Sequence, residues 1–116
     1  MSQRMFEFAH EEFYHVYNRG TDKRTIFEDV SDHTRFVELL FLSNSTFSID
    51  LRHIRKSYES VYDFNRGQVL VHIGVFCLMP NHFHILLTPA VEQGIQIFIQ
   101  KLSTGYSMYF TLNYSE

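Results

Sequence analysis

Alternating apolar and polar positions predict three β-strands in this chain. Residues 12–18, "EFYHVYN", alternate aromatic and β-branched side chains with polar ones, and they lead into a basic loop. Residues 68–79, "QVLVHIGVFCLM", are dense in β-branched residues. The segment "HFHILLTP" (82–89) follows a turn at "MPN" (79–81) and ends in proline, so it is predicted to be the return strand of a hairpin.

Two segments have apolar residues at helical spacing. The first predicts a helix over about residues 32–43, with Ser31 or Asp32 as its N-cap. The second begins near Glu92. Residues 44–67 have mixed periodicity, so we expect an insertion there, a loop with a short helical or extended piece. The apolar positions are Phe36, Leu39, Leu40 and, less regularly, Val37 and Leu42 in the first helix, and Ile95, Phe98, Ile99, Leu102, Tyr106 and Tyr109 in the second.

The order strand, helix, strand, strand, helix predicts an α+β fold. It is most of a ferredoxin-like βαββαβ unit without its last strand, in which an antiparallel sheet carries helices on one face. A length of 116 residues suits one compact domain with a single core. An unpaired sheet edge favours association, so a homodimer is expected.

Composition and charge limit the function classes. The longest apolar run, residues 69–79, is broken by His72 and is shorter than the roughly 20 residues that span a bilayer. A single cysteine, Cys77, fits a reducing cytoplasm. The net charge of −3 weighs against a nucleic-acid partner, although Arg19, Lys23 and Arg24 cluster in one loop.

His82 and His84 are the candidate metal ligands. Side chains alternate between the faces of a strand, so these two project the same way, with Cα atoms roughly 6.6 Å apart. Neutral imidazole nitrogens are ordinary ligands for divalent metals. The alternative is a pair of histidines that each form a local hydrogen bond, and the spacing alone does not decide between the two.

The residues around His82 and His84 resemble a known family motif. "MPNHFHILL" resembles the HUH motif (His, bulky apolar, His) of single-tyrosine transposases, most closely the REP-associated tyrosine transposases and their insertion-sequence relatives. "YHVYNRGTDKRTIFEDVSDHTRFVELL" is similar to that family's first strand, loop and first helix, and "IQKLSTGYSMYFTLNY" to its next helix. The resemblance covers about residues 12–114, apart from 44–67.

The resemblance implies a cytoplasmic, nucleoid-associated bacterial transposase that acts on single-stranded or hairpin DNA. Such enzymes cleave DNA through a phosphotyrosine intermediate, and His82 and His84 would bind the required Mg²⁺ or Mn²⁺. Arg19, Lys23 and Arg24 are expected to contact phosphates. One alternative is a DNA-hairpin-binding module without catalysis. Another is a ferredoxin-like domain whose histidines bind a structural or sensing metal without DNA.

The nucleophile is where the sequence departs from the family. Relatives carry it in a Tyr-Ile-x-x-Asn pattern on a later helix, which is expected beyond Glu116. Within this chain Tyr109 and Asn113 have the same i, i+4 spacing, so Tyr109 is the candidate catalytic residue here. Tyr109 also falls on the apolar stripe of its helix, which predicts burial. Whether the chain is an enzyme therefore stays open at this point.

Overall fold

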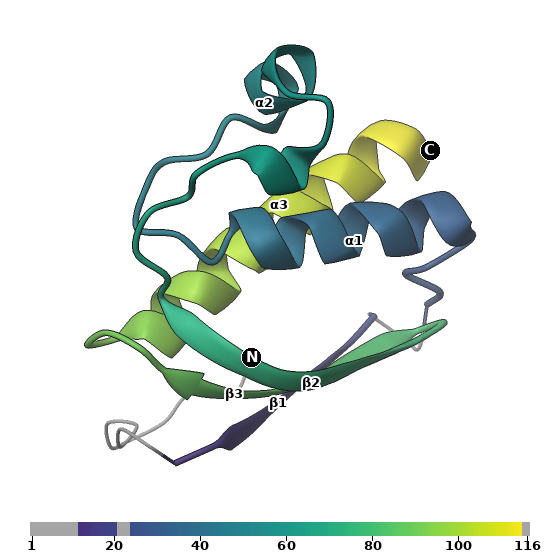
Figure 1. The fold of residues 1–116 in the computed structure, drawn as a ribbon. Helices are drawn as coiled ribbons and strands as arrows, with labels where there is room; N and C mark the ends of the chain where they lie inside the picture. Colours follow the sequence, from purple (N-terminus) through teal and green to yellow (C-terminus); the bar gives the residue numbers. More distant parts are fainter. Residues whose placement is uncertain (1–11, 21–23, 115–116) are drawn as a thin grey trace.

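The predicted α+β architecture is confirmed by a computed structural model that describes residues 12–20 and 24–114, with side chains described as far as residue 111. Figure 1 shows that the helices lie on one side of the sheet and that no other described element covers the opposite side, which we call the open face. The elements are β1 (Tyr14–Arg19), α1 (Val30–Leu42), α2 (Leu51–Ser57), the short 3-10 helix η2 (Val61–Asp63), β2 (Val71–Met79), β3 (His82–Pro89) and α3 (Gly94–Tyr114).

The sheet is three-stranded and antiparallel, in the order β1-β3-β2. Residues 80 and 81 form the turn between β2 and β3, as the sequence predicts. This order is compatible with a ferredoxin-like βαββα arrangement. Within residues 12–20 and 24–114, β1 and β2 each pair on one side only. The expected homodimer stays a prediction.

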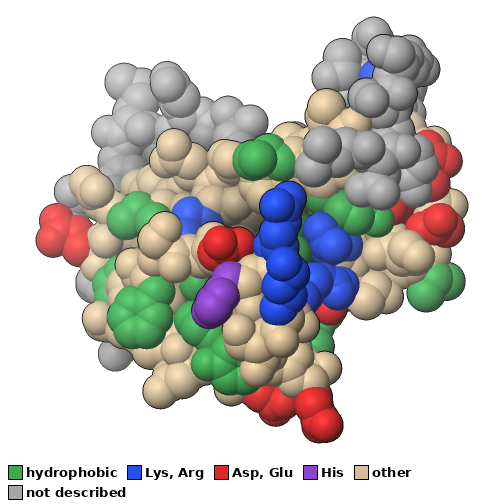
Figure 2. Space-filling view, turned by 90° about the horizontal axis from the view of Figure 1, so that it is seen from above, with side chains coloured by type: hydrophobic (Ala, Val, Ile, Leu, Met, Phe, Trp, Pro, Cys, Tyr) green, Lys and Arg blue, Asp and Glu red, His purple; other side chains and the backbone are tan. Residues whose placement is uncertain are grey.

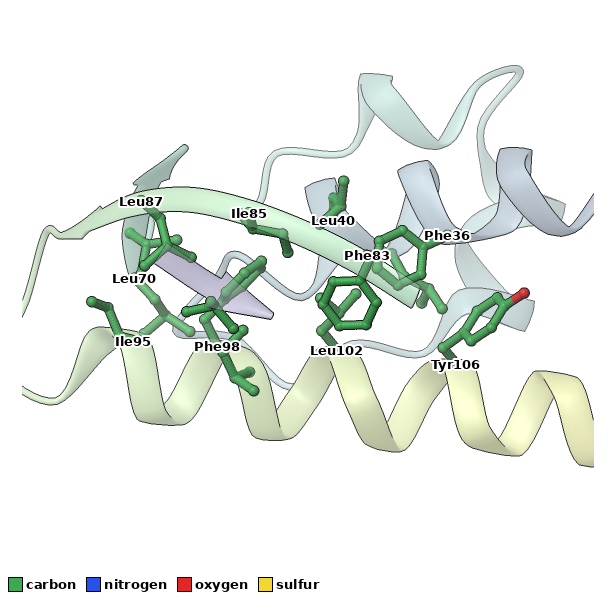
Figure 3. Close-up of a cluster of buried hydrophobic side chains, with 14 of the residues drawn as sticks. Phe36, Leu40, Leu70, Phe83, Ile85, Leu87, Ile95, Phe98, Leu102 and Tyr106 are labelled. Carbon is green, nitrogen blue, oxygen red and sulfur yellow. The ribbon is translucent and has the colours of Figure 1, made fainter. Parts of the chain in front are cut away.

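The core lies between the sheet and the two long helices. Phe83, Ile85 and Leu87 alternate along β3, are buried, and point toward the helices. Figure 3 shows Ile95, Phe98, Leu102 and Tyr106 of α3 directed into the same layer. Burying a large apolar side chain contributes about 1.5–3 kcal/mol, so this alternation fixes which face of β3 points inward.

The start of α1 differs from the prediction. The N-cap is Asp29, whose side chain accepts a hydrogen bond from the Asp32 backbone nitrogen, and the helix begins at Val30. Ser31 and Asp32 lie in the first turn instead. Asp32 is fully buried and its carboxylate accepts from Tyr109 Oη and the Glu28 nitrogen, so tertiary hydrogen bonds give it a different role.

Residues 44–67 contain a small second core as well as the expected short helix. Leu42, Ile54 and Val61 form this cluster, which joins α2 and η2 to the end of α1. Asn44 holds the segment to β2, because its buried side chain accepts from the Leu70 and Val71 nitrogens and donates to the Val71 carbonyl. The insertion therefore packs on the helix side of the sheet and not on the open face (Figure 1).

Candidate functional site: the histidine face

His82 and His84 project from the open face of the sheet. They alternate along β3 with Phe83 and Ile85, whose side chains are buried under the helices. The two imidazole centroids lie 5.0 Å apart. The strand geometry predicted for this pair is therefore confirmed.

The neighbouring strands add side chains to the same surface. Tyr17 lies opposite His84 in the β1–β3 register and Arg19 lies opposite His82. The Tyr17 ring contacts both imidazoles, with centroid distances of 4.9 Å to His84 and 5.6 Å to His82. Paired residues share a face of the sheet. We call this surface the histidine face; it consists of His15, Tyr17 and Arg19 on β1, His82, His84 and Leu86 on β3, and Val75, Cys77 and Met79 on β2.

Each of the two histidines has one ring nitrogen in a hydrogen bond. His82 Nδ1 lies 2.7 Å from Asn81 Oδ1. His84 Nδ1 lies 2.7 Å from His15 Nε2, and the two rings meet edge to edge at these nitrogens, with centroids 4.9 Å apart and an interplanar angle of 9°. Because an amide oxygen only accepts, the neutral form of His82 in this bond carries its proton on Nδ1 and leaves a lone pair on Nε2.

The electrostatics of the histidine face favour the neutral imidazole. The pKa of His84 is lowered from its ordinary value by desolvation and then by the neighbouring His15 and His82. His84 therefore keeps its neutral form to a lower pH than an isolated histidine does. The neutral form is the one that binds a metal ion.

The two histidine donors fit a metal site whose remaining ligands are water or substrate oxygens. In their neutral forms, His82 and His84 offer two nitrogen donors on one strand. Among the described residues, no group of three or more His, Cys, Asp or Glu side chains is placed to hold a metal ion. Mg²⁺ and Mn²⁺ prefer oxygen ligands, and Mg²⁺ keeps several waters, so water and phosphate oxygens would supply the remaining positions.

Described residues on both sides of 21–23 hydrogen-bond to the turn that precedes β3. The Gly20 nitrogen donates to the Asn81 carbonyl, and the Ile26 nitrogen donates to the Pro80 carbonyl, both at 2.8 Å. Arg19 and Arg24 both line a cleft of about 500 Å³ whose other wall is α3. Arg19 and Arg24 therefore line the same cleft, and Arg19 alone of the two is placed opposite His82 by the register, whereas Lys23 lies outside the described residues.

A second group of cations lies on the opposite side of the molecule. Figure 2, which views the helix side, shows Lys and Arg side chains gathered beside an acidic one. Glu38 Oε1 lies 3.1 Å from Arg55 Nη2 and 3.6 Å from Arg35 Nε, so one buried carboxylate partly neutralises two guanidinium groups. These cations do not contribute charge to the histidine face.

Tyr109 is not brought together with the histidines within one chain. It belongs to α3, on the covered side of the sheet, where its hydroxyl donates to Asp32 Oδ1 at 2.6 Å. The Arg35 guanidinium lies 4.4 Å from the centre of its ring. Desolvation and the Asp32 carboxylate raise the pKa of Tyr109 to about 12, so its hydroxyl keeps its proton at neutral pH.

The structure places His15 and Tyr17 on the histidine face, although no sequence motif singles them out. Both are outward positions of β1, and the alternation in "YHVYNR" puts them on the same face as Arg19. That alternation was available from the sequence. Their distance from His84 depends on the pairing of β1 with β3, which the pattern of apolar residues in one strand does not specify.

The arrangement presents two metal-competent imidazoles, a tyrosine ring and a guanidinium group on one open surface. The Arg19 guanidinium lies 5.6 Å from the centre of the Tyr17 ring. None of the helices in the described part of the chain has the length and apolar character needed to cross a membrane. In comparisons with family models, curated proteins and solved structures, no match to this chain was found.

Proposed function

We propose that the histidine face binds a divalent metal ion together with single-stranded or hairpin DNA, as the metal half of a single-tyrosine transposase site. The observation that carries the proposal is the pair His82 and His84 on one exposed strand face, each with Nδ1 in a hydrogen bond. The resemblance of "MPNHFHILL" to the HUH motif supports the same function.

The metal would be held by the Nε2 atoms of His82 and His84. When bound, Mg²⁺ or Mn²⁺ polarises a phosphate oxygen and neutralises negative charge that develops during phosphodiester cleavage. The chain's own residues would bind the metal ion and orient the imidazole rings that hold it. Asn81 fixes the ring of His82 through Nδ1.

The surroundings of the pair suit a DNA strand more than a duplex. Tyr17 is 39% exposed and lies beside both imidazoles, so its ring offers a stacking surface for an unpaired base. Arg19 and Arg24 line one cleft at the end of β1, and guanidinium groups pair well with the phosphates of a DNA backbone. This local charge offsets the overall net charge of −3.

The proposal predicts that Mn²⁺ strengthens DNA binding through the histidines. The measurement is fluorescence anisotropy of a labelled hairpin oligonucleotide with a single-stranded flank, titrated with protein with and without Mn²⁺. We expect Mn²⁺ to increase the affinity of the wild type and to leave that of His82→Ala unchanged, because the ion bridges imidazole and phosphate. An equal Mn²⁺ effect in both proteins would contradict the proposal.

A second prediction concerns Arg19, which is exposed on the histidine face. Replacing it with alanine should reduce the slope of log K against log salt by about 0.7 to 0.9, the value for one lost phosphate contact. Arg52→Ala is a matched control, because Arg52 is an exposed cation on α2, on the helix side. A slope that changes in Arg52→Ala and not in Arg19→Ala would indicate that DNA binds on the helix side, and it would contradict this proposal.

A hairpin-binding module without catalysis is the second candidate. The bond of Tyr109 to Asp32 on the covered side of the sheet favours it, because that hydroxyl is not available to a phosphate on the histidine face. Metal-dependent cleavage of a hairpin oligonucleotide distinguishes the two. Cleavage that disappears in His82→Ala supports the transposase function, and binding without cleavage supports the module.

A further inference from the structure

We infer that His15 is a positioning residue: it accepts a hydrogen bond from His84 Nδ1 and thereby keeps His84 in the tautomer that binds metal through Nε2. This inference rests on the proposed function of the histidine face. It gives a specific role to a residue of β1 that lies 69 positions away from its partner in the sequence.

The contact between the two residues is close and set by the fold. His15 Nε2 lies 2.7 Å from His84 Nδ1, and the rings are nearly parallel. His15 is opposite Leu86 in the register and Tyr17 is opposite His84, so His15 reaches its partner diagonally across the strand pair. Among the described side chains, His15 is the one that hydrogen-bonds the His84 ring.

A bond between two neutral imidazole nitrogens needs one N–H group and one lone pair. When His84 Nδ1 carries the proton, His84 Nε2 has the lone pair that a metal ion needs. When His15 Nε2 carries it instead, His84 must hold its own proton on Nε2 and cannot bind metal there. The acceptor role of His15 therefore selects the metal-competent form of His84.

His82 shows the same arrangement with an unambiguous partner. Asn81 Oδ1 can only accept, so it holds the proton of His82 on Nδ1. Asn81 comes from the hairpin turn next to the motif, whereas His15 comes from another strand. His82 is thus oriented locally, and His84 is oriented only when β1 is paired with β3.

Two variants of the intact chain separate the hydrogen bond from the packing of the ring. His15→Phe keeps an aromatic ring against His84 but has no acceptor nitrogen. His15→Gln loses the ring but offers Oε1 as an acceptor. We expect the Mn²⁺ affinity, measured by calorimetry, to fall about tenfold or more in His15→Phe, because loss of a residue that hydrogen-bonds a metal ligand typically has an effect of this size. In His15→Gln the affinity should stay near the wild-type value, because the acceptor is restored.

A second readout needs no metal. Nitrogen chemical shifts of the metal-free protein report the tautomer of His84, which should be protonated on Nδ1 in the wild type and in His15→Gln and shift toward protonation on Nε2 in His15→Phe. An unchanged tautomer and unchanged Mn²⁺ affinity in His15→Phe would overturn the inference.

Two further outcomes separate this inference from the proposed function. If affinity falls equally in both variants and pulsed EPR with Cu²⁺ counts three imidazoles in the wild type, His15 is a ligand itself and the positioning role is wrong. If the wild type binds no Mn²⁺, the proposed function fails, and the tautomer measurement alone decides the role of His15.

Discussion

Replacing Asp32 with alanine is expected to lower the free energy of unfolding by about 3–5 kcal/mol. The Asp32 carboxylate is fully buried and accepts two hydrogen bonds, from Tyr109 Oη at 2.6 Å and from the Glu28 nitrogen at 2.7 Å. Alanine leaves both donors without their acceptor, at about 1–3 kcal/mol each, and removes an acidic group from the first turn of α1. Urea unfolding followed by circular dichroism measures the difference.

Asp29→Ala is the matched control for this prediction. Asp29 is exposed and caps the same helix through one hydrogen bond to the Asp32 nitrogen, so its loss should cost about 1 kcal/mol. Tyr109→Phe removes the hydrogen bond that Tyr109 donates to Asp32, so its loss of stability should fall between those of Asp29→Ala and Asp32→Ala. A loss of stability in Asp32→Ala no larger than that in Asp29→Ala would show that the buried carboxylate is not a structural centre.

The second large effect is the absence of covalent attachment to DNA through Tyr109. A labelled hairpin oligonucleotide incubated with Mn²⁺ and this 116-residue chain should give no protein–DNA band on a denaturing gel. In-line attack requires a hydroxyl within about 3 to 3.5 Å of the phosphate. The Tyr109 hydroxyl is instead bonded to Asp32 on the covered side of the sheet, and its pKa is raised to about 12.

Tyrosine variants give this prediction a clear outcome. A covalent band that disappears in Tyr109→Phe would contradict it and would require α3 to leave its place against α1. Tyr17 provides the comparison, because its ring lies on the histidine face. A band that survives Tyr109→Phe and disappears in Tyr17→Phe would also contradict the prediction and would make Tyr17 the nucleophile.

The fold was largely predictable because strong local patterns mark its elements. Alternation in "HFHILLTP" with a proline turn before it predicts β3 with the bounds that are observed, and it puts His82 and His84 on one face. Helical spacing likewise predicts the stripe of α3 that packs on the sheet. In both cases the information lies within a few neighbouring residues.

Features that depend on contacts between distant segments were not predictable in the same way. The sequence predicts Ser31 or Asp32 as the N-cap of α1, whereas the observed cap is Asp29 and the Asp32 carboxylate instead accepts a hydrogen bond from Tyr109, 77 positions away. The partnership of His15 with His84 similarly follows from strand pairing. Local propensity depends on neighbouring residues and does not specify contacts between residues far apart in the sequence.

The most direct test of the central claim, that His82 and His84 bind a divalent metal ion, is a calorimetric titration with Mn²⁺. The wild type should give a saturable heat, and His84→Ala should bind at least about tenfold more weakly, because losing a ligand costs more than losing an outer partner. His72→Ala is the control, since His72 is an exposed histidine at the other end of the sheet, opposite Thr88 in the register, and should bind like the wild type. The same heat for wild type and His84→Ala would contradict the metal site and the function proposed for it.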